Sequence, residues 1–182
     1  MPLVTLQPGK PAVAAGRSRS ARTAAAALVS ACVLAAFAAA PASAASLSQS
    51  LDVDATPAAV WSAIGPFCAI QNWLPPIGSC VEDGKSPPTR TLVTRDGAAT
   101  FVETETARND DRHFYSYTFK SSPLPVTRYN STIEVAARGE HGSTVTWRST
   151  YTPQPGQEQA ANEALSGVYA SGLAFIKSRF AE

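Results

Sequence analysis

The middle of the chain is a succession of strand-like segments joined by short turns, and one long helical segment follows them. Residue patterns typical of strands cover 46–53, 77–82, 90–94, 99–108, 113–120, 129–137 and 143–152. The separators between the later segments are rich in Gly, Asp, Asn, Ser and Pro, which favour turns. Because short connections of this kind join antiparallel neighbours, we expect a single antiparallel sheet.

Helical segments are expected in two places. A short helix begins at Pro57 after Thr56 as N-cap, and a second covers 68–73. A long helix covers 157–180, with an apolar stripe through Ala161, Leu165, Val168, Gly172 and Phe175, and Ile176 beside it. It is the only segment long enough to cover one face of the sheet. The sequence therefore predicts an α+β domain in which a curved seven-stranded antiparallel sheet wraps around a long C-terminal helix.

The first 44 residues have the layout of a secretory signal peptide. Three arginines between 17 and 22 precede an apolar run over 24–40, and small residues offer a cleavage site after Ala44. The run is short and alanine-rich for a membrane span. We therefore expect one domain over 45–182, periplasmic or secreted, without stable membrane insertion after processing. Attachment of a lipid at Cys32 is the alternative.

The charge and motifs of the mature chain exclude several classes of function. Removal of the first 44 residues leaves 11 basic and 14 acidic side chains, a net charge of −3. A mildly acidic domain is a poor candidate for binding nucleic acid. The sequence has no phosphate loop, nucleophile elbow or metal-ligand spacing, so we expect no cofactor and no metal. The oligomeric state stays open.

Two cysteines, Cys68 and Cys80, remain after removal of the signal peptide. In an oxidising compartment such a pair is a candidate disulfide, which would stabilise the fold by about 3 kcal/mol. The alternative is two buried free thiols.

Motifs spread over nearly all of residues 46–180 carry a family resemblance. They are Thr56–Trp61, Gly65–Cys68, Trp73–Pro75, Cys80, Arg90–Leu92, Asp96–Gly97, Asp110–Asp111, Tyr115–Tyr117, Leu124–Val126, Tyr129, Ser131 and Thr132. In this order they resemble the SRPBCC superfamily of START and Bet v 1-like proteins, within its polyketide cyclase/dehydrase and lipid transport branch. The resemblance implies a helix-grip fold with two short helices after the first strand and a hydrophobic cavity. It leaves the function open, because the superfamily contains carriers, receptors and enzymes. Where many relatives carry a polar residue, often histidine, this chain has Leu74, which removes a histidine acid or base there.

Side-chain alternation and the resemblance identify residues expected to meet the cavity. The expected ligand-binding residues are Trp73, Leu92, Glu103, Tyr117, Leu124, Tyr129, Ser131, Trp147, Ser149, Tyr151, Val168 and Gly172. The alternative is that these aromatic side chains fill a solid core. The resemblance also implies two entrance loops over 95–98 and 121–126, with Leu124 over the mouth, although ordinary hairpin turns are nearly as good an interpretation.

Glu103 is the acidic residue among these candidates. The resemblance implies an acid at this strand position that points into the pocket. A carboxylate there must be hydrogen-bonded or have a raised pKa, and we expect Tyr117, Tyr129 and Ser131 as its partners. The alternative places Glu103 in water on the outer face of the sheet.

The favoured interpretation is an exported protein that binds or transports a small hydrophobic, lipid- or polyketide-like ligand. The alternative is an enzyme of the cyclase or dehydratase type that uses Glu103 as general acid or base. A third interpretation is an interaction module with a filled interior.

Overall fold

The computed structural model of the protein describes residues 43–181. All but the last two residues of the expected signal peptide, and the candidate lipid site Cys32, lie outside this range. Within the described residues, no helix is both long and apolar enough to span a membrane.

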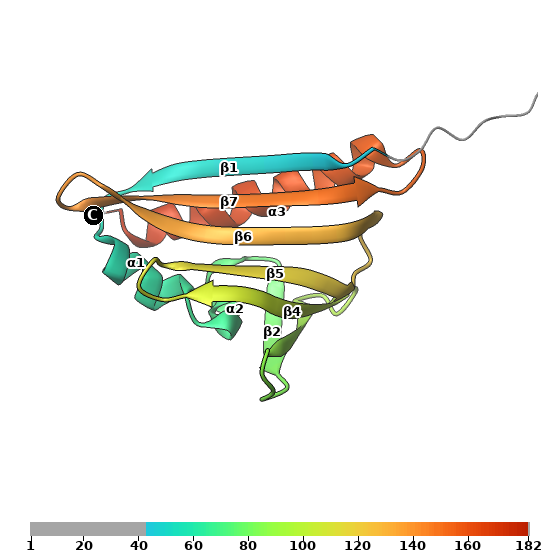
Figure 1. Ribbon diagram of the computed structural model, residues 1–182, viewed down its shortest axis with the longest axis horizontal. Coiled ribbons are helices and arrows are strands. Elements are labelled where there is room, and N and C mark those ends of the chain that lie inside the picture. Colours follow the sequence, from blue (N-terminus) through green and yellow to red (C-terminus); the bar gives the residue numbers. More distant parts are fainter. Residues whose placement is uncertain (1–42, 182) are drawn as a thin grey trace, which may run out of the picture. The chain divides into compact units, whose positions relative to one another are not determined.

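One antiparallel sheet and three α-helices make up the described part of the chain (Figure 1). In chain order the elements are β1 (Ala45–Val53), α1 (Pro57–Ile64), the 3-10 helix η1 (Phe67–Ala69), α2 (Ile70–Trp73), β2 (Ile77–Glu82), β3 (Thr89–Thr94), β4 (Thr100–Asn109), β5 (Phe114–Ser121), β6 (Val126–Arg138), β7 (Gly142–Pro153) and α3 (Glu158–Arg179). The seven strands lie in the order β1-β7-β6-β5-β4-β3-β2. The predicted helix-grip architecture is confirmed.

The short helix α1 has the ends that its sequence predicts. Thr56 Oγ1 accepts a hydrogen bond from the backbone N–H of Ala59 at 3.4 Å, and Pro57 is the first helical residue. Gly65 follows the last turn, where a Cβ atom would lie 2.6 Å from the Trp61 ring. Only glycine therefore lets the chain turn away so close to this buried tryptophan.

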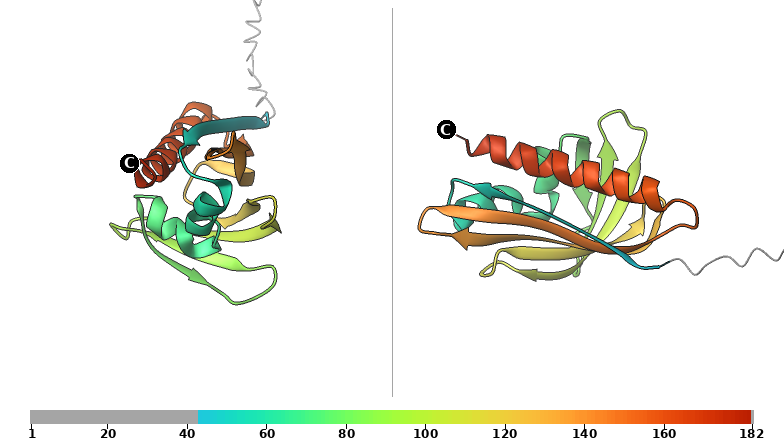
Figure 2. Two further views of the ribbon diagram at one scale, coloured as in Figure 1. Left: turned by 90° about the vertical axis from the view of Figure 1, so that its left-hand side faces the viewer. Right: turned by 90° about the horizontal axis from the view of Figure 1, so that it is seen from above.

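The sheet curves around the side on which the helices lie. Strand β1 pairs with β7 along its whole length, from Ala45 opposite Tyr151 to Val53 opposite Ser143. The first strand of the sequence therefore lies beside the last. Seen end-on, the strands follow an arc, with α3 and the short helices on its inner side (Figure 2). The apolar face of the sheet is thereby covered by α3, which packs on β1 and β7, together with the short helices.

The buried face of α3 differs in part from the predicted stripe. Its buried residues are Ala161, Leu165, Tyr169, Gly172, Leu173 and Ile176. The inclusion of Phe175 was wrong, because its side chain is 39% exposed. Each residue turns the helix by about 100°, and the face centred on Leu165, Tyr169 and Ile176 leaves Phe175 on the outer side.

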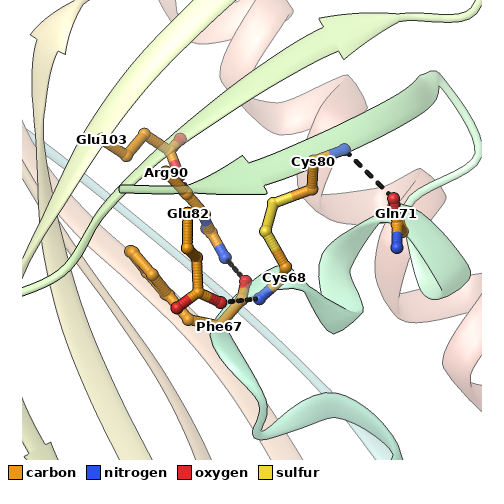
Figure 3. Close-up of a disulfide and its surroundings, with 7 residues drawn as sticks. All are labelled: Phe67, Cys68, Gln71, Cys80, Glu82, Arg90 and Glu103. Carbon is orange, nitrogen blue, oxygen red and sulfur yellow. Dashed lines mark hydrogen bonds and ion pairs between the residues drawn. A yellow bond between two sulfur atoms is a disulfide. The ribbon is translucent and has the colours of Figure 1, made fainter. Parts of the chain in front are cut away.

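The predicted disulfide between Cys68 and Cys80 is confirmed (Figure 3). It joins η1 to β2, with the two Cα atoms 5.4 Å apart. The backbone N–H of Cys68 donates to Glu82, and that of Cys80 donates to Gln71, both at 3.1 Å. The covalent bond and these hydrogen bonds fix the short helices against the edge of the sheet.

Candidate functional site

A cavity of about 180 Å³ lies between the sheet and the helices α2 and α3. The residues that line it are Ile70, Leu74, Pro76, Ile77, Leu92, Thr94, Phe101, Glu103, Tyr117, Phe119, Leu124, Tyr129, Trp147, Leu165, Val168 and Tyr169. Most of these side chains are apolar. The aromatic residues of the sheet therefore do not fill the interior completely, and the expectation of a space beneath the long helix is met.

The mouth of the cavity is marked by lining residues that remain partly exposed. Pro76 is exposed, and Thr94, Phe101, Phe119, Leu124 and Val168 are each half-buried, whereas the other lining residues are buried. Leu124 thus lies at the rim, as the family resemblance implied. None of residues 95–98 lines the cavity, so only the second expected entrance loop contributes a side chain; its role as a gate stays a prediction.

Glu103 points inward, but its partner is not one of the expected hydroxyls. The residue is 4% exposed, and its Oε2 accepts a hydrogen bond from Arg90 Nε at 2.6 Å. The expectation of Tyr117, Tyr129 and Ser131 as partners was wrong. Arg90 and Glu103 are direct cross-strand neighbours on β3 and β4, so their side chains leave the sheet on the same face.

Arg90 is completely buried and contacts both Glu103 and Phe67. Its Nη1 donates to the carbonyl oxygen of Phe67, and its guanidinium lies 4.0 Å from the centroid of the Phe67 ring (Figure 3). Burial by itself lowers the pKa of Arg90, but the adjacent charge of Glu103 raises it above its usual value. Arg90 therefore stays positively charged and neutralises Glu103.

Glu103 lines the cavity, and one of its two carboxylate oxygens makes no hydrogen bond to the described residues. Oε2 is engaged by Arg90, and Oε1 has no hydrogen-bond partner among residues 43–181. Burial raises the pKa of Glu103, and the charge and hydrogen bond of Arg90 oppose that rise. The carboxylate thus offers a hydrogen-bond acceptor whose charge is already compensated.

A series of hydrogen-bonded hydroxyls links lining residues of the cavity to Ser131 behind the wall. Tyr129 and Tyr169 share a hydrogen bond of 2.7 Å between their hydroxyl oxygens, and Tyr169 lies 3.0 Å from Ser131 Oγ. Trp147 Nε1 donates to both Tyr117 at 3.1 Å and Ser131 at 3.0 Å. Burial raises the pKa of Tyr117 and Tyr129 well above the usual value, so these hydroxyls stay protonated.

Seven of the twelve expected ligand-binding residues line the cavity: Leu92, Glu103, Tyr117, Leu124, Tyr129, Trp147 and Val168. The other five, Trp73, Ser131, Ser149, Tyr151 and Gly172, do not. They stand behind the wall: Trp73 packs edge-on against Trp147, Ser131 hydrogen-bonds Tyr169, and Tyr151 donates to Asn162. A Cβ atom on Gly172 would lie 3.0 Å from the Trp147 ring, so its small size permits the close approach of α3. Ser149 is buried without a partner for its hydroxyl among the described residues.

Several lining residues were missed, and simple patterns identify them. Phe101 and Phe119 stand two residues from Glu103 and Tyr117 on their strands, so alternation puts each on the same face. Tyr169 lies four residues after Leu165, on the same face of α3. The pair of Arg90 and Glu103 follows from a hairpin centred on Asp96 and Gly97, which sets them opposite each other.

Comparison with known proteins identifies the family. The family described as polyketide cyclase / dehydrase and lipid transport matches residues 44–181. The solved structure of XoxI from Bacillus cereus is 33% identical with a TM-score of 0.71, over 75% of this chain and 95% of that one. No curated protein matches the chain.

Two more distant structures share the fold. The Zhui aromatase/cyclase from Streptomyces sp. R1128 is 12% identical with a TM-score of 0.64, over 75% of this chain and 93% of that one. Norcoclaurine synthase from Thalictrum flavum is 16% identical with a TM-score of 0.60, over 75% and 86%. The match to nearly all of the described residues shows that this chain belongs to the polyketide cyclase/dehydrase and lipid transport family of the SRPBCC superfamily.

Proposed function

We propose that this protein is exported and binds a small, mostly apolar ligand in the cavity beneath α3. The observation that carries the proposal is the cavity itself, with an apolar wall and a few polar groups gathered around Glu103 and the tyrosines. An apolar wall supplies affinity by burial, and a few fixed polar groups orient the guest.

The volume of the cavity limits the size of the ligand. An apolar cavity of about 150 Å³ binds benzene, and pockets for drug-sized ligands have about 300–1,000 Å³. At about 180 Å³ the cavity suits a guest with a single ring or a short chain. A larger lipid- or polyketide-like molecule would have to extend through the mouth past Phe119 and Leu124. We therefore favour a single-ring ligand.

Two further observations support this proposal. Norcoclaurine synthase, which shares the fold, was solved in complex with dopamine and hydroxybenzaldehyde, each of which has one ring. The disulfide between Cys68 and Cys80 supports export, because disulfides persist in oxidising compartments.

The pairing of Glu103 favours binding over acid–base catalysis. Uptake of a proton by Glu103 would leave the buried charge of Arg90 without its carboxylate partner. An uncompensated charge in an apolar interior is costly, so the pair resists the proton exchange that a general acid or base needs. A fixed acceptor that orients a ligand requires no such exchange.

The binding proposal is tested on the protein purified without denaturation, by mass spectrometry of released small molecules and by thermal shift. The control variant is Val168→Phe, which adds a ring at the cavity wall. We expect a single-ring compound from the wild type and much less from a folded Val168→Phe protein. Equal ligand content in both proteins, or an empty wild type that no single-ring compound stabilises, would contradict binding in this cavity.

Export has its own test, by cell fractionation and N-terminal sequencing of the full-length chain expressed in a bacterium. We expect the mature protein to begin at Ala45 and to lie outside the cytoplasm. An intact N-terminus on protein recovered from the cytoplasm would contradict export without affecting the binding proposal.

A further inference from the structure

Only one of the residues that line the cavity carries a formal charge, and that charge is neutralised. Glu103 is paired with Arg90, which lies behind the wall, so the pair as a whole is neutral. A cationic guest would bring an unpaired positive charge into an apolar space, and an anionic guest would meet the free Oε1 of Glu103. Both are unfavourable, because a buried charge needs a partner. The cavity therefore selects against charged ligands.

Glu103 nevertheless needs a hydrogen-bond donor at Oε1, which has no partner among the described residues. An ionised carboxylate only accepts hydrogen bonds. The Thr94 hydroxyl, which also lines the cavity, already donates to Asp96 at 2.6 Å. A guest with a donating group would thus complete the coordination of the carboxylate.

The hydroxyl chain has a direction that ends at a backbone carbonyl. Ser131 Oγ donates to the carbonyl oxygen of Arg148 at 3.0 Å, so it accepts from Tyr169. The hydroxyl hydrogen of Tyr169 is thus donated to Ser131, so Tyr169 must accept the 2.7 Å hydrogen bond from Tyr129. The hydroxyl hydrogens of Ser131, Tyr169 and Tyr129 are therefore all donated in hydrogen bonds of normal length.

Tyr117 stands at the start of that series of hydroxyls and donates the weakest hydrogen bond in it. Its hydroxyl accepts from Trp147 Nε1, and its nearest acceptor is the Tyr129 hydroxyl at 3.5 Å, the outer limit of a hydrogen bond. Tyr117 can therefore donate to a guest at little cost. The residues that line the cavity thus include one acceptor without a partner among the described residues, Glu103 Oε1, and one weakly bonded donor, the Tyr117 hydroxyl.

We propose that the ligand is an uncharged single-ring compound with a hydroxyl group, such as a phenol, which donates to Glu103 and accepts from Tyr117. A hydroxyl is the smallest group that both donates and accepts. This inference rests on the proposed ligand-binding function and specifies the chemistry of its ligand.

The test is calorimetric titration of the mature protein at pH 7 with five single-ring probes. They are p-cresol; its isomer anisole, which accepts but cannot donate; toluene, which has no polar atom; benzylamine, which is cationic; and benzoate, which is anionic. We expect p-cresol to bind about tenfold more tightly than anisole or toluene, a difference of about 1.4 kcal/mol. The two charged probes should bind more weakly than toluene.

A pair of variants separates the hydroxyl contact from general effects on the fold. Tyr117→Phe removes the donor but leaves Trp147 Nε1 bonded to Ser131, and Tyr151→Phe removes a hydroxyl outside the cavity. We expect Tyr117→Phe to weaken p-cresol binding about tenfold with toluene binding unchanged, and Tyr151→Phe to change neither.

The outcomes distinguish this inference from the proposed function. Binding of toluene and anisole as tight as that of p-cresol, or p-cresol binding that Tyr117→Phe does not weaken, would overturn the hydroxyl assignment and leave a ligand-binding cavity. Failure of all five probes to bind would overturn the single-ring binding site itself.

Discussion

Replacing Arg90 by methionine removes the positive partner of a buried carboxylate. Methionine keeps an unbranched side chain of similar shape, so packing against Phe67 is partly retained. The variant loses the 2.6 Å ion pair with Glu103, the hydrogen bond to the Phe67 carbonyl oxygen and the cation–π contact at 4.0 Å. Glu103 is left charged and without a protein partner in an apolar interior.

The expected loss is large compared with the stability of a typical domain. Removal of one partner of a buried ion pair costs about 3–5 kcal/mol, and domains are stable by about 5–15 kcal/mol. We therefore expect Arg90→Met to lower the free energy of unfolding by about 4 kcal/mol. The double variant Arg90→Met with Glu103→Leu removes both charges, and its stability should lie within about 1 kcal/mol of the wild type.

The loss of stability caused by Arg90→Met should increase with pH. Without Arg90, burial raises the pKa of Glu103 further above the value of an unfolded glutamate, about 4.3. A carboxyl with a raised pKa in the folded state contributes stability at low pH and loses it as the pH rises through that pKa. The deficit of Arg90→Met should therefore be largest at pH 7 and shrink toward pH 4.

The assay is urea unfolding followed by tryptophan fluorescence, since Trp73 and Trp147 are buried. The matched control is Arg148→Met, which breaks an ion pair of similar length, 2.7 Å, between exposed and half-buried side chains; it should cost at most about 1 kcal/mol. The electrostatic reasoning is refuted if Arg90→Met costs no more than this control, or if the double variant is as unstable as the single one.

Three further predictions concern the fold. Replacing both Cys68 and Cys80 by serine should lower the free energy of unfolding by about 3 kcal/mol, and a reductant should destabilise the wild type but not this variant. Gly172→Ala should cost about 1–3 kcal/mol in the same urea assay because its Cβ meets Trp147, whereas Gly167→Ala on the same helix meets nothing and should be neutral or stabilising by up to about 1 kcal/mol. Burial raises the pKa of all five tyrosines. Tyrosinate absorbance of the folded protein should therefore stay low as the pH passes about 10 and rise on unfolding, and the free energy of unfolding should fall above that pH. Titration of the folded protein at the ordinary tyrosine pKa would contradict this.

The fold was predictable because each strand carries its own pattern and each connection is short. The predicted and observed strands agree except at their ends. The largest difference is at β6, predicted from Tyr129 and observed from Val126. Its pairing with β7 is irregular between Thr127 and Asn130, and Arg128 has a positive φ of 50°. An irregularity of this kind breaks the alternation by which the start of a strand is recognised.

The site was predictable only in part, because a single strand does not reveal what stands beside it. The inward position of Glu103 came from the family resemblance, and alternation placed Tyr117 and Tyr129 on the inner face. The partner of Glu103 depends on the register between two strands. Arg90 is completely buried, but an arginine in a strand is normally expected to face solvent, so the sequence of β3 alone does not predict this burial. Whether Ser131 or Tyr169 reaches the cavity depends on the distance between α3 and the sheet. That distance is set by side-chain packing, which a sequence pattern does not reveal.

The most direct measurement is a crystal structure of the protein grown with p-cresol. The account predicts one ring in the cavity between the sheet and α3, with its oxygen within hydrogen-bond distance of Glu103 Oε1 and the Tyr117 hydroxyl. An interior that holds no ring at saturating p-cresol, or that closes so that Glu103 turns out to solvent, would contradict it.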